Sequence, residues 1–166
     1  MRRAAAIAIG VLVIAGCSRA PSISDNGTTG SALEAAAQRT GLIVDPATID
    51  PVGAWARATD RVCVVPAADG KYRVGALIDY GAGQNCAASG IAERRKDGLR
   101  IDFGACRIDA RLSGDRLIFP ATVDEACARY CRGRASFAAL SVDHVSDARS
   151  EAVTLRAPDR TPLCPA

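Results

Sequence analysis

The sequence has 166 residues, with 21 Lys and Arg against 18 Asp and Glu, seven Cys and a single His. This length suits one domain with a short tether, and the mixed charge disfavours a nucleic-acid-binding function. Aromatic residues make up only 4% of the chain. The core must therefore be built from Val, Ile, Leu and Ala, and we expect disulfide bonds to compensate for a thin core.

The chain begins with a short positive segment and an apolar run. Arg2 and Arg3 precede residues 4–15, which are small and apolar throughout. Such a pattern is typical of a secretory signal, and the run is shorter than the roughly 20 residues that cross a bilayer. We expect residues 1–16 to be a signal peptide that is removed. Its loss takes away two arginines and no acid, which leaves 19 basic and 18 acidic residues in the mature chain.

The end of the apolar run, Ile14-Ala15-Gly16-Cys17, resembles the lipobox of bacterial lipoproteins, with Ile14 in the place where Leu is usual. The resemblance implies cleavage before Cys17, a diacylglyceryl group on its sulfur and acylation (typically palmitate) of its amine. Several acyl chains hold a protein stably at a membrane, whereas one holds it marginally. Ser18 after the cysteine implies the outer membrane, facing the periplasm. An ordinary secretory signal with an incidental cysteine is the alternative.

Six cysteines remain beyond the lipobox, and an even number in an exported chain predicts three disulfide bonds. They are Cys63, Cys86, Cys106, Cys127, Cys131 and Cys164. Spacing leaves the pairing open, although we expect Cys127 and Cys131 to pair with distant parts of the chain, Cys106 and Cys164 being candidates. A zinc site at Cys127 and Cys131 is the alternative. No motif predicts a metal or another cofactor.

Residues 17–30 combine the lipidation site with a stretch rich in Ser, Thr, Gly, Asn and Pro, which predicts a flexible tether. Ser31 and Glu34 form a capping-box pattern, so a helix is predicted over 32–40. Gly41 supplies a left-handed stop. Because the helix has only a narrow apolar face, we expect it to pack on the domain as a lid.

The helix and its connector occupy residues 31–52, and residues 53–166 form the predicted disulfide-rich β domain. Short runs of β-forming residues separated by turn signals predict about eight strands. They cover 61–65, 72–80, 88–95, 99–103, 106–112, 116–119, 135–142 and 151–155. A short helix is predicted at 124–131. This spacing indicates a small antiparallel barrel or sandwich.

The tripeptide Gly53-Ala54-Trp55 precedes the first predicted strand and resembles the opening of calycin-type barrels, which include bacterial periplasmic protease inhibitors. The resemblance covers residues 53–86 and implies that Trp55 closes one end of a barrel. It further implies a bond between Cys63 and Cys86 and a function in binding an exported protease. The later cysteines depart from that family, and a role for Trp55 in the core alone is the alternative.

No motif for a catalytic nucleophile is present, and we assign no catalytic residue. His144 is the one available imidazole. Asp143 is beside it, and Ser146 and Asp147 lie near it in the sequence, so a Ser-His-Asp site is one hypothesis. The segment otherwise resembles an exposed loop after a strand. A surface His without a role is the simpler interpretation.

These patterns favour a non-catalytic lipoprotein of the cell envelope that presents a small β domain for partner binding or envelope support. The expected partners are the membrane, through the lipid anchor, and an envelope protein, with no nucleic acid. An inhibitor of an exported protease, or of lysozyme, is the alternative, although a near-neutral mature chain would not steer toward a strongly basic lysozyme. A small hydrolase that uses His144 is the third hypothesis.

Overall fold

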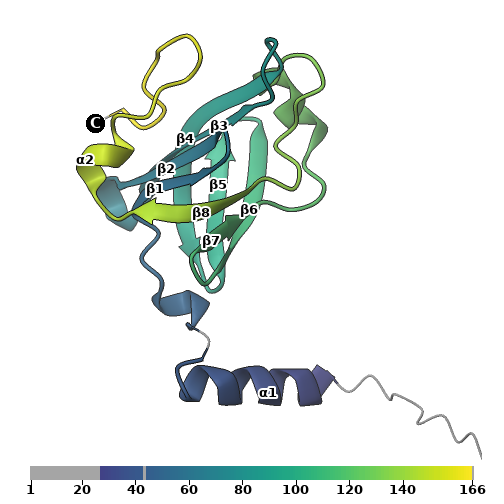
Figure 1. The fold of residues 1–166 in the computed structure, drawn as a ribbon, viewed down its shortest axis with the longest axis vertical. Coiled ribbons are helices and arrows are strands. Elements are labelled where there is room, and N and C mark those ends of the chain that lie inside the picture. Colours follow the sequence, from purple (N-terminus) through teal and green to yellow (C-terminus); the bar gives the residue numbers. More distant parts are fainter. Residues whose placement is uncertain (1–26, 43, 166) are drawn as a thin grey trace, which may run out of the picture.

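The computed structural model describes residues 27–42 and 44–165, so the predicted signal peptide, Cys17 and most of the predicted tether lie outside the described residues. Within them, eight antiparallel strands follow one another in chain order and close into a barrel when β1 pairs with β8 (Figure 1). The strands are β1 (Gly53–Arg57), β2 (Asp60–Pro66), β3 (Tyr72–Asp79), β4 (Asn85–Arg95), β5 (Gly98–Phe103), β6 (Cys106–Ser113), β7 (Arg116–Ile118) and β8 (Ser141–Ser146). The predicted fold class, a small antiparallel barrel or sandwich of about eight strands, is confirmed, and the architecture is the barrel.

Short helical segments accompany the barrel. They are α1 (Gly27–Arg39), η1 (Pro46–Thr48), η2 (Ala68–Gly70), η3 (Glu125–Tyr130) and α2 (Arg149–Ala152). In the part of the chain that the structure describes, no helix is both long and apolar enough to cross a membrane.

Alternation along the strands fills the barrel with apolar side chains. It is clearest in β6, where Cys106, Ile108, Ala110 and Leu112 are buried and the residues between them are exposed. Inward residues from all eight strands belong to a single core cluster. The interior of the barrel is therefore occupied by its own side chains.

The two ends of the barrel differ because successive strands run in opposite directions. The tether end is the end at which the chain arrives from α1 and η1, and it carries the β2–β3, β4–β5 and β6–β7 turns. Near it, the fully buried Trp55 donates its indole N–H to the Pro51 carbonyl at 3.0 Å. The loop end carries the long segment 119–140 between β7 and β8. There Phe137 packs on Phe103, with ring centroids 5.8 Å apart.

The N-terminal helix differs from the prediction in its start and its packing. It begins at Gly27, so it includes the last residues of the predicted tether and places Ser31 within the helix instead of at its cap. Gly41 ends the helix as predicted, with φ +72° and a Schellman-type bond from the Leu42 amide to the last turn. No described side chain of α1 is buried, and Leu33 is 73% exposed. The expectation that the helix packs as a lid is wrong.

Two of the predicted strands are also wrong. Residues 151–155 form the end of α2 and a turn, and β1, which was not predicted, takes the eighth place in the barrel. Only the last two residues of 135–142 belong to β8, because Phe137 and Leu140 turn inward ahead of it and close the loop end. The helix predicted at 124–131 is the 3-10 helix η3, and the Asp124 carboxylate caps it.

Candidate functional site: a cleft between two disulfide-held loops

All three disulfide bonds join a loop to the barrel. They are Cys63–Cys164, Cys86–Cys131 and Cys106–Cys127. The two cysteines of the η3 segment are thus tied to β4 and β6, and the C-terminus is tied to β2. The prediction of three disulfide bonds is confirmed. Cys106, predicted as a partner of Cys127 or Cys131, pairs with Cys127. Cys164 was the other predicted partner, but it pairs with Cys63. The Cys63–Cys86 bond implied by the resemblance to protease inhibitors is wrong. No thiolate of these six remains for zinc binding or nucleophilic catalysis.

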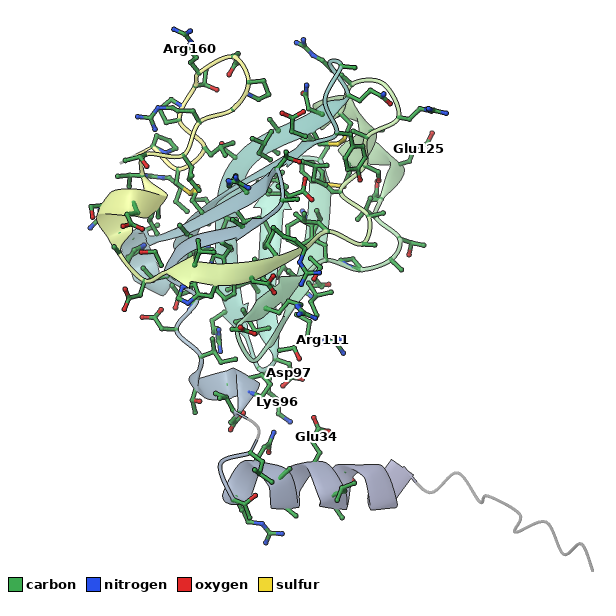
Figure 2. All side chains as sticks on the ribbon, viewed as in Figure 1. Glu34, Lys96, Asp97, Arg111, Glu125 and Arg160 are labelled. Atoms are coloured by element: carbon green, nitrogen blue, oxygen red, sulfur yellow. A yellow bond between two sulfur atoms is a disulfide. The ribbon has the colours of Figure 1, made fainter. Side chains whose placement is uncertain are left out.

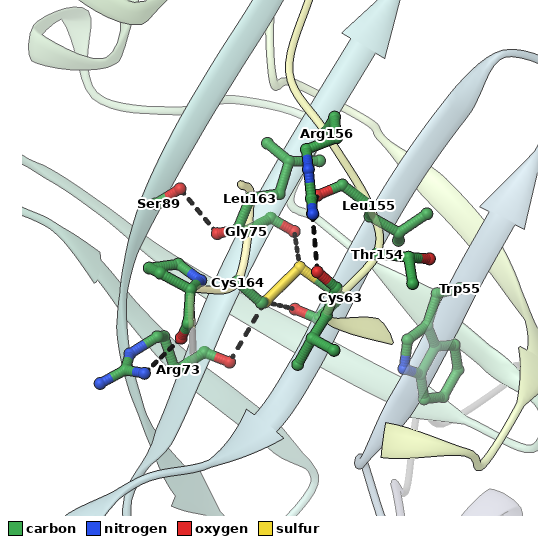
Figure 3. The surroundings of a disulfide bond; sticks show 12 residues. Trp55, Cys63, Arg73, Gly75, Ser89, Thr154, Leu155, Arg156, Leu163 and Cys164 are labelled. Carbon is green, nitrogen blue, oxygen red and sulfur yellow. Dashed lines mark hydrogen bonds between the residues drawn. A yellow bond between two sulfur atoms is a disulfide. The ribbon is translucent and has the colours of Figure 1, made fainter. Parts of the chain in front are cut away.

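The C-terminal strap, residues 153–165, lies on the outer face of β2 and β3 (Figure 3). Leu163 and Cys164 are almost fully buried there, in an apolar cluster separate from the barrel interior. Gly75 permits the close approach, because a Cβ at that position would lie 2.3 Å from the Leu163 carbonyl oxygen. The Ser89 hydroxyl donates to the same oxygen at 2.7 Å. The strap is therefore fixed to the barrel by packing, hydrogen bonds and a covalent bond.

Residues 156–162 of the strap form a protruding loop with its own internal bonds. Arg156 and Pro162 pair at its base. The Asp159 carboxylate accepts hydrogen bonds from the Thr161 hydroxyl and amide at 2.7 and 3.0 Å, and these bonds lower the pKa of Asp159. Arg160 stands at the tip of the loop (Figure 2). The loop is thus held at its base and stiffened across its tip.

A cleft of about 360 Å³ lies between this loop and the η3 segment. Its floor is the first half of β4, including Asn85, Ala87 and Ser89. One wall is formed by residues 129–132 and the other by residues 157–159 with Thr161 and Leu163. Both walls are held by disulfide bonds, so this cleft is the part of the surface whose shape the cross-links define most directly.

The cleft carries an excess of unpaired positive charge. Arg129 and Arg132 are exposed on the η3 wall, and among the described residues neither makes an ion pair or a side-chain hydrogen bond. Asp159 on the opposite wall is already engaged by Thr161. Arg132 is close enough to Asp159 for its charge to contribute to the lowered pKa of that carboxylate. The two arginines nevertheless leave the cleft with a net positive charge that can attract an anionic group.

A second groove, on the outer faces of β3 to β6, has a different character. Its sides are covered by ion pairs between neighbouring strands, such as Lys71–Glu93 at 3.0 Å and Arg100–Asp109 at 2.7 Å. These pairs lower the pKa values of Glu93 and Asp109. Because exposed charges that are already paired contribute little to stability or attraction, this groove is best explained as a solvated sheet face.

His144 lies in β8 and not in an exposed loop, which corrects the prediction. Its half-buried ring packs against Trp55, with ring centroids 4.3 Å apart. Its Nε2 atom is 3.2 Å from the Val52 carbonyl oxygen, so the tautomer that donates from Nε2 forms a hydrogen bond there. The imidazole is thus part of the packing at the tether end.

The residues of the hypothesised Ser-His-Asp site do not meet. Asp143 accepts hydrogen bonds from Arg57 at 3.0 Å and from Arg116 at 3.1 Å, and these bonds lower the pKa of Asp143. Ser146 accepts a hydrogen bond from a following backbone amide at 3.1 Å. Since neighbouring residues of a strand point to opposite faces, Asp143 faces outward while His144 packs on Trp55. The hydrolase hypothesis has no support in this geometry.

The cleft itself was not found from the sequence. The prediction singled out the cysteines, but not Arg129, Arg132 or Ser89. The available signal was two arginines beside the closely spaced pair Cys127 and Cys131, which would have placed positive charge on a cross-linked segment. Comparisons with protein-family models, curated proteins and solved structures gave no significant match to this chain.

Proposed function

We propose that this chain is a lipid-anchored protein of the bacterial cell envelope whose barrel binds a partner protein at the cleft between η3 and the C-terminal strap. The observation that carries the proposal is the contrast between the inside and the outside of the barrel. The interior is filled by one apolar cluster, whereas all three disulfide bonds hold the segments that line an external cleft.

A filled interior favours recognition at the surface. Barrels that hold a small molecule keep an internal cavity or an open mouth for it. Here fully buried aromatic side chains occupy both ends, Trp55 near the tether end and Phe137 at the loop end. Rigid loops favour protein binding, because less conformational entropy is lost when a partner is bound.

The position of the cleft fits an anchored protein. The segments that line the cleft lie at the loop end. In Figure 1 the yellow loop of the C-terminal strap is at the end of the molecule opposite α1. Nine residues separate Cys17 from Gly27, and this stretch can reach at most roughly 35 Å. A membrane that holds Cys17 would therefore lie on the α1 side, and the cleft would face away from the lipid.

Anchoring is tested by replacing Cys17. The Cys17→Ala chain expressed in a bacterial host is expected to remain an unprocessed precursor and to take up no radiolabelled palmitate. The Ser18→Ala chain is the matched control, and it should be processed and labelled normally. Cleavage of the Cys17→Ala chain followed by its release as a soluble protein would contradict the anchor.

Partner binding is tested by photo-crosslinking in cells. A photoreactive amino acid in place of Ser89, on the cleft floor, is expected to give a discrete adduct that excess unlabelled domain suppresses. The same amino acid in place of Ile91, in the ion-paired groove outside the cleft, is the control and should give none. Adducts of equal yield at both positions, or none at either, would count against the cleft as the binding site.

Inhibition of an exported protease is a second candidate function, and the protruding loop of the strap favours it. The loop is closed at its base, stiffened by Asp159 and carries Arg160 at its tip. Trypsin-like serine proteases bind a basic side chain beside the cleaved bond. If this function holds, the native chain should inhibit such a protease at micromolar concentration and Arg160→Ala should not. An absence of inhibition across protease classes would remove it.

A further inference from the structure

We infer that the cleft binds an extended, acidic peptide segment, which adds as a short strand to the free backbone edge of β4. The inference rests on the proposed function, since it names the partner chemistry and the binding mode of the same cleft.

The free edge arises because β4 is longer than its neighbour. β3 pairs with β4 from Asn85 onward, but β5 begins to pair with β4 only at Ile91. The η3 segment covers the beginning of this edge, where Cys86 and Cys131 form an isolated bridge. The stretch 87–89 is left between these two partners, and it lies on the floor of the cleft.

Alternate backbone groups of this stretch point away from β3. The Asn85 carbonyl accepts from the Arg132 amide at 2.7 Å, so the backbone of Asn85 is directed toward η3 and away from β3. In an antiparallel strand every second residue directs its N–H and C=O to the same side. The backbone N–H and C=O of Ser89 therefore point away from β3 as well. Among the described residues, no backbone group on that side forms a hydrogen bond with them.

An unpaired strand edge is a template for another strand, and many peptide-binding domains use it in this way. The short free stretch limits the addition to a few residues, which suits a linear segment more than a complete sheet edge. Ala87 and Ser89 are small, so side chains of an added strand would have room between the walls.

The charge of the walls selects an acidic segment. Arg129 and Arg132 line one wall, and neither forms an ion pair among the described residues. The carboxylate of Asp159 is the acid among the residues that line the cleft, where it accepts hydrogen bonds from Thr161 and feels the charge of Arg132 without forming an ion pair with it. Guanidinium groups bind carboxylates with two parallel hydrogen bonds when they are free to do so.

The experiment measures the binding of fluorescein-labelled peptides to the full processed chain by fluorescence anisotropy. The probe alternates Glu and Val, and the comparison peptides alternate Lys and Val or carry N-methyl groups on every second amide of the acidic probe. The acidic probe is expected to bind at least about tenfold more tightly than either comparison peptide. The basic peptide loses the charge-assisted hydrogen bonds, and the N-methylated peptide loses backbone hydrogen bonds. Its affinity should fall as salt is raised.

Two variants make the result specific. The double variant Arg129→Ala and Arg132→Ala is expected to bind the acidic probe at least about tenfold more weakly than the native chain. Arg107→Ala, which removes an exposed arginine from the ion-paired groove, should leave the affinity unchanged. Circular dichroism of each variant shows whether the barrel has folded, and only folded variants are compared.

Each outcome bears on the inference. Equal binding of the N-methylated peptide would overturn strand addition, and equal binding of the basic peptide, or equal loss in both variants, would overturn acidic recognition in the cleft. If the acidic probe does not bind while the Ser89 photo-crosslink persists, the inference fails and the proposed function stands. If both are absent, both fail.

Discussion

Removal of the Cys63–Cys164 bond by a double substitution to Ala is expected to be the costliest of the three disulfide deletions. This bond closes a sequence separation of 101 residues, compared with 45 for Cys86–Cys131 and 21 for Cys106–Cys127. In the chain-entropy model, these separations stabilise the folded state by about 4.7, 4.0 and 3.3 kcal/mol respectively. The largest value is a major share of the roughly 5–15 kcal/mol that stabilises a small domain.

The same deletion should release the strap before the barrel unfolds. Barrel closure depends on the pairing of β1 with β8 and does not involve the strap. Without the covalent bond, the strap is held chiefly by the burial of Leu163, worth about 2 kcal/mol, and by hydrogen bonds such as that from Ser89. These are weak enough for local opening to precede global unfolding.

The assay compares urea unfolding of the three double variants with that of the native chain, all without reductant. A second readout is limited trypsin digestion, in which cleavage after Arg160 should be slow in the native chain and fast once Cys63 and Cys164 are both Ala. The reasoning would be refuted if this variant were no less stable than the one that lacks the Cys106–Cys127 bond. Equally fast cleavage in the native chain would show that the strap is not fixed.

Three further substitutions test other parts of the structure. Trp55→Phe removes the hydrogen bond to the Pro51 carbonyl and leaves a small cavity, and chemical denaturation should show a loss of about 1–3 kcal/mol. Gly75→Val places side-chain atoms where the Leu163 carbonyl lies, so it should cost at least about 1 kcal/mol and speed tryptic cleavage of the strap. Because hydrogen bonds from two arginines lower the pKa of Asp143, its contribution is present above the unfolded-state pKa of about 3.9 and is lost as pH falls through the folded-state pKa. The free energy of unfolding of the native chain should therefore exceed that of Asp143→Asn at neutral pH, and the difference should disappear in acid.

The central strands of the barrel could be predicted from local signals. The segments that became β2 to β7 combine β-forming residues with turns that contain Gly and Asp, and their bounds agree with the structure to within a few residues. The alternation in β6 is visible in the sequence itself, where Cys106, Ile108, Ala110 and Leu112 are separated by polar residues. Local propensity and tertiary packing favour the same structure there.

The first and last strands could not be predicted in this way. β1 contains two alanines, a glycine and an arginine, which have low β propensity. It forms because it pairs with β2 on one side and β8 on the other, and because Trp55 is buried between them. Gly53 is required at φ +135°, where a Cβ would lie 2.0 Å from the Ser146 carbonyl oxygen. These are long-range conditions that a short window of sequence does not contain.

The cleft could not be predicted because its parts are distant in sequence. The number of disulfide bonds followed from counting cysteines, but their pairing depends on which strands close the barrel. The floor comes from Asn85 and residues 87–89, one wall from 129–132 and the other from 157–159 with Thr161 and Leu163. The free edge of β4 depends in addition on where β5 stops, at Phe103. Only the folded barrel brings these features together.

The asymmetry between the two ends of the barrel is itself evidence for where function lies. Adjacent antiparallel strands need a turn of only a few residues, and the β4–β5 and β6–β7 connections are of that kind. The segment 119–140 is far longer than the joining of β7 to β8 requires. Phe119, Phe137 and Leu140 use part of it to close the core. That need does not explain the exposed Arg129 and Arg132 or the two disulfide bonds at Cys127 and Cys131, whereas the proposed role as a rigid and positively charged wall for a bound segment explains both.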